Sequence, residues 1–140
     1  VGLVAVTPAA GFVGPMSALA IGAIAAVPSY FCLIWRARTS LDDSLDVVAA
    51  HGLGGTVGAL LTGVFAQKAI NGVQDGLLFG NPGQLATQAT AVLAVIAYSG
   101  IASFILLKVI GLFTPLRASA PDEGAGMDIT QQGEEAYIQT

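Results

Sequence analysis

The single histidine of the chain, His51, lies inside a run of residues that carries no formal charge. Residues 47–67 contain no Asp, Glu, Lys or Arg, and Asp42, Asp43 and Asp46 stand just before them. A neutral imidazole offers one hydrogen-bond donor and one acceptor, and it can exchange a proton near neutral pH. One such group in an apolar run indicates a functional site, or a buried histidine that simply hydrogen-bonds a neighbouring helix.

The elements that must position His51 follow from composition. Hydrophobic residues make up 54% of the 140 residues and charged residues 10%, whereas soluble domains carry about 25% charged residues. Residues 1–35, 47–67 and 76–107 contain no charged side chain, and a helix that spans a bilayer needs about 20 apolar residues. The sequence therefore predicts an all-α membrane protein.

Several classes of function are disfavoured by the same composition. Basic residues are too few and too scattered for a nucleic-acid surface. The one cysteine, Cys32, forms no internal disulfide and no CxxC site. We expect no metal, no cofactor and no enzymatic activity.

Apolar stretches, turn residues and one capping pattern predict the organisation of the chain. Ser40-x-x-Asp43 has the form of a capping box, so the helix with His51 should begin near Ser40. The first ten residues are apolar but too short to span, which predicts that the chain is the C-terminal part of a larger membrane protein cut within a transmembrane segment. The predicted segments are the end of a truncated helix (1–10), a transmembrane helix (11–35), a cytoplasmic loop (36–41), a transmembrane helix with His51 (42–67), an extracytoplasmic loop (68–88), a transmembrane helix (89–112) and a cytoplasmic tail (113–140).

The orientation follows from the basic residues. In this arrangement Arg36, Arg38, Lys108 and Arg117 fall on one side of the membrane and Lys68 on the other. The positive-inside rule therefore places the loop at 36–41 and the tail in the cytoplasm.

Helix geometry predicts the depth and surroundings of His51. With about 1.5 Å of rise per residue from Ser40, His51 lies about 16 Å into the helix, near the middle of a hydrocarbon core of about 30 Å. Two rows of small residues follow it and predict close helix packing. They are Gly54, Gly58 and Thr62 in one row, and Gly55, Ala59 and Gly63 in the other.

Three blocks of sequence resemble the ammonium transporter (Amt) family, in family order and spacing. They are VGLVAVTPAAGFVGP, DDSLDVVAAHGLGGTVGALLTGVFA and GMDITQQGEEAY. The resemblance implies the C-terminal transmembrane helices of an eleven-helix fold, a homotrimer in the cell membrane, and a narrow hydrophobic pore in each subunit. His51 matches the second of two pore histidines, and the first belongs to the N-terminal half of the family fold. The tail resembles a region that takes part in regulation by P-II-type proteins.

The resemblance implies passage of ammonium or ammonia through a histidine-lined pore. Two further residues are candidates for that pore. Asp46 is either a pore-side acid or an anchor of the cytoplasmic helix start, and Thr7 matches a family position near the pore or caps the backbone before Pro8.

Two alternative functions remain open at this point. One is an Amt-type ammonium sensor without net transport. The other is a membrane anchor with His51 as a haem ligand, although a six-coordinate haem needs a second axial ligand and the chain has no other histidine.

Overall fold

The computed structural model describes residues 1–135, and this range is helical, with turns and loops but no strand. Three helical segments in it are long and apolar enough to cross a membrane, namely Pro15–Arg36, Val48–Phe65 and Gly83–Ile110. The predicted all-α architecture is confirmed.

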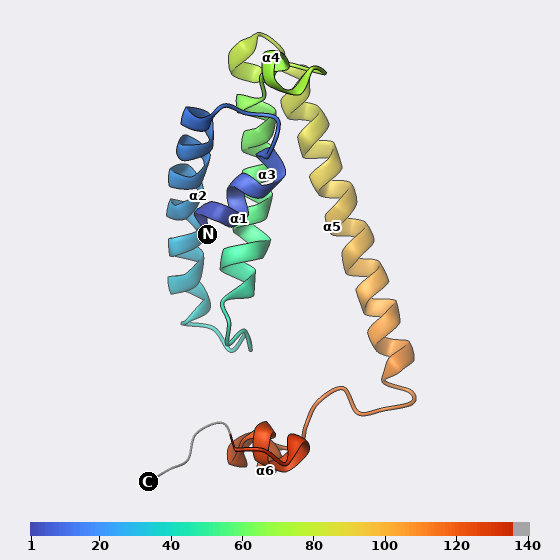
Figure 1. Ribbon diagram of the computed structural model, residues 1–140. Helices are drawn as coiled ribbons and strands as arrows, with labels where there is room; N and C mark the ends of the chain where they lie inside the picture. The colour runs from blue at the N-terminus through green and yellow to red at the C-terminus, as the bar shows by residue number, and fades with distance from the viewer. Residues whose placement is uncertain (136–140) are drawn as a thin grey trace. The chain divides into compact units, whose positions relative to one another are not determined.

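The chain divides into two compact units, Val1–Ile96 and Ala97–Thr140, with helix α5 (Gly83–Ile110) running from one into the other. The first unit holds the longer helices (Figure 1), and the second holds the rest of α5 and short helical turns. Before α5, the first unit contains α1 (Gly2–Val6), the 3₁₀ turn η1 (Thr7–Ala9), α2 (Pro15–Arg36), the π-helical turn η2 (Val48–Leu53), α3 (Gly54–Phe65), α4 (Lys68–Asn71) and the 3₁₀ turn η3 (Leu77–Phe79).

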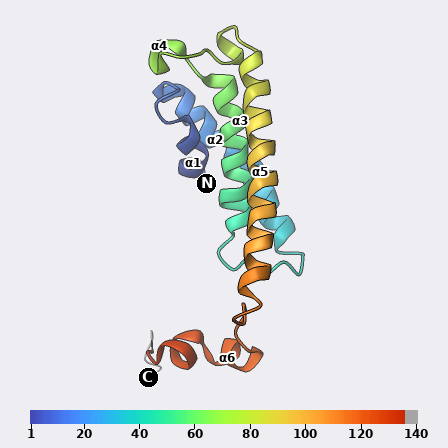
Figure 2. The ribbon, with the colours of Figure 1, turned by 90° about the vertical axis from the view of Figure 1, so that its right-hand side faces the viewer.

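The core of the first unit lies where the short helix α1 packs on both α2 and α3 (Figures 1 and 2). Ala5 and Ala9 from the N-terminal segment and Ile21 and Ala25 from α2 are fully buried there. Three of these four side chains are single methyl groups, so the helix backbones can approach closely. Apolar side chains pack around this core, namely Val6, Val13, Val57, Leu61 and Phe65.

The closest approach in this core is between Gly58 of α3 and Ala5 of α1. A Cβ atom at position 58 would lie 2.0 Å from the carbonyl oxygen of Ala5 and 2.7 Å from its Cα. Both are backbone atoms, so no side-chain rotation can relieve the clash. Glycine at position 58 is therefore a condition for the α1–α3 contact.

The segment after α2 differs from the predicted start of the next helix near Ser40. Residues 40–46 are not helical, and regular helix begins only around Val48. The Asp43 carboxylate accepts hydrogen bonds from the backbone N–H groups of Val47 (2.9 Å) and Val48 (2.8 Å). Asp43 thus caps the helix that follows it, instead of forming the N3 position of a capping box at Ser40.

The segment predicted as a loop at 68–88 contains structure of its own. Helix α4 ends in a polar turn, where Asp75 accepts from the N–H of Lys68 (2.7 Å) and Asn71 donates to the carbonyl oxygen of Gln74 (2.8 Å). Helix α5 then begins at Gly83, six residues before the predicted Ala89. Asn81 and Pro82 are turn residues and lie just before the helix. The Gln and Thr residues after Gly83 are compatible with a helix.

The second unit continues beyond α5 in short helical turns, α6 (Ala120–Ala125) and the π-helical η4 (Asp128–Gln132). Ser119 caps α6 by accepting from the N–H of Asp122 (3.3 Å). Arg117 donates to Glu123 (2.7 Å), and this hydrogen bond lowers the pKa of the Glu123 carboxylate. The last five residues of the predicted tail, 136–140, lie outside the described range.

The contact between Gly58 and Ala5 predicts a position-specific loss of stability. We expect Gly58→Ala to lower the free energy of unfolding by roughly 3 kcal/mol, because overpacking against backbone forces the helices apart. Gly55→Ala is the matched control, since a Cβ there would meet only the Val4 Cγ1 atom, at 4.0 Å. The measurement is thermal unfolding of the purified complete protein in detergent. Equal melting temperatures for the two variants would contradict the described α1–α3 packing.

Candidate functional site

His51 lies in the π-helical turn η2, which leads directly into α3. A π-helical turn inserts one extra residue into the helical repeat and occurs frequently at functional sites. The local sequence Val-Ala-Ala-His-Gly-Leu has small residues on both sides of the histidine. The imidazole is exposed in the first unit, so it is not enclosed by its own helix bundle.

An open groove of about 330 Å³ runs between η2–α3 and the first half of α5, and His51 lines it. Three of its lining side chains are polar: His51, Thr56 and Gln88. None of the described residues around it carries a carboxylate, an ammonium or a guanidinium group. The remaining lining residues are small or aliphatic, namely Gly52, Gly55, Ala59, Ala91, Val92, Val95 and Ile96.

The two rows of small residues behind His51 have different surroundings. Gly54, Gly58 and Thr62 are buried, and Cβ atoms at Gly54 and Gly58 would meet Ser29 of α2 and Ala5 of α1. Gly55 and Ala59 stand four and eight residues after His51, on the same helix face, and line the groove. The first row brings helices together, whereas Gly55 and Ala59 of the second row leave room beside the imidazole.

Gly63 lies where the end of α3 meets the start of α5. A Cβ atom at Gly63 would lie 2.9 Å from the Gln88 Cγ atom and 3.0 Å from the Leu85 Cα atom of α5. Helix α5 therefore begins in close contact with the end of α3. This contact holds Gln88 at the groove.

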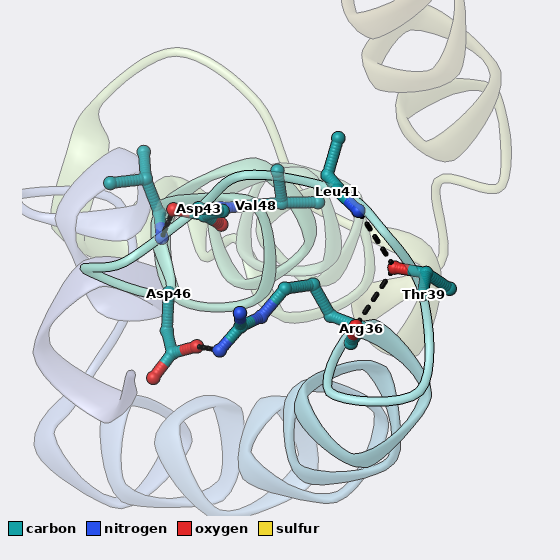
Figure 3. A network of polar contacts seen from close by, with 7 residues as sticks. Arg36, Thr39, Leu41, Asp43, Asp46 and Val48 are labelled. Atoms are coloured by element: carbon teal, nitrogen blue, oxygen red, sulfur yellow. Dashed lines mark hydrogen bonds and ion pairs between the residues drawn. The ribbon is translucent and has the colours of Figure 1, made fainter. Parts of the chain in front are cut away.

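Asp46 and Thr7, the other two predicted pore residues, do not line this groove. Asp46 forms an ion pair with Arg36 at the end of α2 (Figure 3). The Thr7 hydroxyl donates to the carbonyl oxygen of Leu3, one turn earlier (2.7 Å). Their roles in a pore stay predictions.

Thr56, Gln88 and the pairing of Arg36 with Asp46 were not predicted from the sequence, where Arg36 served only to set the orientation. Thr56 follows His51 by five residues and lies in α3, beyond the π-helical turn, yet both residues line the groove. Gln88 comes from another helix, and Arg36 lies ten residues before its partner Asp46. A polar residue within an apolar span was the only available signal, and it applied to Thr56 but not to Gln88, the last residue of the predicted loop at 68–88.

No group of three or more His, Cys, Asp or Glu side chains that could hold a metal ion occurs within residues 1–135. The groove offers hydrogen-bond donors and acceptors from one imidazole, one hydroxyl and one amide. This set suits a small neutral hydrogen-bonding species, because nothing in it compensates a full charge.

These features define a class of protein: a multi-pass helical membrane protein with one imidazole on an uncharged groove. The model of the Ammonium Transporter Family matches residues 1–137. The chain belongs to this family, which confirms the resemblance found in its sequence.

Individual relatives agree with the family match. The chain is 45% identical over 137 residues to an ammonium transporter of Aquifex aeolicus, covering 97% of the chain and 32% of the relative. It is 41% identical over 136 residues to ammonium transporter Amt1 of Archaeoglobus fulgidus, covering 97% and 34%. The crystal structure of Saccharomyces cerevisiae Mep2 superposes with a TM-score of 0.78 at 31% identity, covering 99% of the chain and 33% of Mep2. The chain thus spans about a third of the length of the curated relatives it matches.

The Asp43 cap predicts a dependence on pH at the start of the helix with His51. Hydrogen bonds from the N–H groups of Val48 and then Val47 lower the pKa of Asp43 from its ordinary value of 3.8, and the charge of Arg36 adds to this. Since the folded pKa is lowered, the cap contributes its full stability above the ordinary pKa and loses it as the pH falls through the folded value.

We expect the amides of Val47 and Val48 to lose protection from hydrogen exchange as the pH falls below about 4, after correction for the intrinsic rate. In Asp43→Ala the protection should be lower and independent of pH in this window. The amide of Ala25 within α2 is the control, because helix carbonyls hold it. Protection at Val47 and Val48 that persists to the lowest pH would contradict this role of Asp43.

Proposed function

We propose that this chain supplies the C-terminal part of an ammonium transporter and that His51 handles ammonia inside its passage. The observation that supports the proposal is the position of His51, the single histidine, on an uncharged groove in a chain of this family. Relatives that match almost the whole chain are named ammonium transporters. A transporter, not an enzyme, is the function that fits these features best.

The physical reason is the cost of desolvation. An ammonium ion that enters an apolar passage loses hydration worth many times the thermal energy, whereas neutral ammonia loses only a few hydrogen bonds. A passage that removes a proton at its mouth can therefore select ammonium over potassium, which has no proton to lose. Ammonia then needs hydrogen-bond partners inside, but no compensating charge.

The groove residues fit these requirements. A neutral imidazole both donates and accepts a hydrogen bond, so His51 can bind ammonia or pass a proton without a fixed charge. Aliphatic residues from α5, such as Val92 and Val95, keep the surroundings apolar. Gly55 and Ala59 leave space along the helix for a molecule as small as ammonia.

The proposal extends to the assembly. We propose a homotrimer in the cell membrane, with the loop after α2 and the C-terminal tail in the cytoplasm. The orientation rests on the positive-inside rule, because Arg36, Arg38, Lys108 and Arg117 share one side. The tail would then be available to a P-II-type regulatory protein.

The test is transport by the complete protein that carries this chain, reconstituted in liposomes on a solid-supported membrane. Ammonium should evoke a current or a pH change in the liposome lumen that potassium does not evoke. We expect His51→Ala to reduce the rate by about tenfold to a hundredfold, because loss of a hydrogen-bond partner in an apolar site costs roughly 1.5–3 kcal/mol.

Thr90→Val is the matched control for this test. The Thr90 hydroxyl donates to the carbonyl oxygen of Ala86 within its own helix (2.9 Å), and Thr90 does not line the groove. We expect its transport rate to stay near that of the unaltered protein. Ammonium binding without flux would indicate a sensor, and an unchanged rate in His51→Ala would rule out the proposed role of His51.

A further inference from the structure

A polar cluster connects the end of α2 to the turn that carries His51 (Figure 3). Arg36, the last residue of α2, donates from Nη2 to the Asp46 Oδ1 atom. The two side chains are largely covered, with 22% and 35% of their surfaces exposed. The Nε atom of Arg36 is buried without a hydrogen-bond partner among the described residues. Asp46 is the carboxylate that pairs directly with this cation, and the Arg36 charge also acts on Asp43.

Asp46 also has an unusual backbone conformation. Its φ is +54°, and it is the one residue other than glycine with a positive φ within the described range. Aspartate and asparagine tolerate this left-handed region better than most residues, because their short polar side chains can hydrogen-bond locally. The chain reverses direction here, immediately before the helix begins.

The backbone of Asp46 accepts a hydrogen bond of the first turn of the helix that follows. The carbonyl oxygen of Asp46 accepts from the N–H of Ala50 (2.9 Å), and Asp43 holds the N–H groups of Val47 and Val48. His51 comes one residue after Ala50. The side chain of Asp46 is thus tied to α2, while its backbone sets the first turn of the segment with His51.

We propose that the Arg36–Asp46 ion pair is a positioning clamp that fixes the direction of His51. Successive residues of a helix are rotated by about 100°, so a slip of one residue at Asp46 would turn His51 away from the groove. A π-helical turn pairs residues five apart and an α-helical turn pairs residues four apart, so a shift of the hydrogen bonds by one residue would convert one into the other. The ion pair opposes the slip by fastening Asp46 to the end of α2. This inference rests on the proposed role of His51 in transport.

The experiment compares variants that separate charge from backbone conformation in the complete transporter. Asp46→Asn keeps the tolerance for positive φ but removes the charge, Arg36→Gln removes the partner charge, and Arg36→Lys retains it. Arg38→Gln is the matched control, because it removes the same charge two residues further on. Each of the first three is also combined with His51→Asn.

We expect Asp46→Asn and Arg36→Gln to lower the maximal ammonium flux about tenfold with KM within about twofold, because His51 acts after entry. Arg36→Lys should recover most of the flux, and Arg38→Gln should leave it unchanged. In the His51→Asn background, loss of the clamp should reduce the residual flux less than about twofold, since the clamp acts through His51. A full tenfold effect in that background would overturn the proposal.

A second measurement does not depend on transport. Hydrogen exchange at residues 48–53 should become faster in Asp46→Asn and Arg36→Gln and stay unchanged in Arg38→Gln. Unchanged exchange in the first two variants would overturn the clamp. Should His51→Asn leave transport unaltered, the proposed function of His51 fails, and faster exchange at residues 48–53 would still support the clamp as the device that fixes this turn.

Discussion

The backbone contact between Gly58 and Ala5 is the constraint on which the first unit depends. With the Ala5 carbonyl oxygen only 2.0 Å from where a Cβ would stand, α1 and α3 touch through their main chains. Such contact replaces the large apolar side chains that hold soluble helices together, because lipid is as apolar as leucine and gives helices no hydrophobic reason to associate. Dispersion attraction between closely fitted helix surfaces holds the helices together instead. The core is accordingly built mainly from alanines around Ile21.

The same helix uses small residues for two opposite purposes. On one face Gly58 allows another backbone to approach, and on another face Gly55 and Ala59 leave a groove beside His51. The difference comes from the neighbouring element: α1 lies across the first face, and α5 approaches the second closely only at Gly63. Whether a small residue allows close packing or leaves open space therefore depends on the element that faces it. That neighbour is set by the tertiary structure.

This dependence on tertiary structure limits what the sequence alone can predict. Long uncharged stretches are a consequence of the bilayer itself, so the existence of the three spanning helices was predictable from hydropathy. The start of the helix with His51 was not predictable in the same way. Ser40 and Asp43 satisfied the capping pattern, yet Asp43 holds the N–H groups of Val47 and Val48, further along the chain. Gln88 and Arg36 could not be assigned either, because the first reaches the groove from a distant helix and the second acts through a turn that only the structure reveals.

The distribution of charge links the clamp to the proposed passage. Between Asp46 and Lys68 the chain has no titratable side chain except His51. An unpaired Asp46 near the start of this segment would attract and retain ammonium, whereas an unpaired Arg36 would repel it. Paired with each other, the two charges largely cancel at a distance, so neither effect extends along the segment. The ion pair can thus fasten the turn without adding a net charge of its own beside the segment, and a single charged residue at that place could not do both.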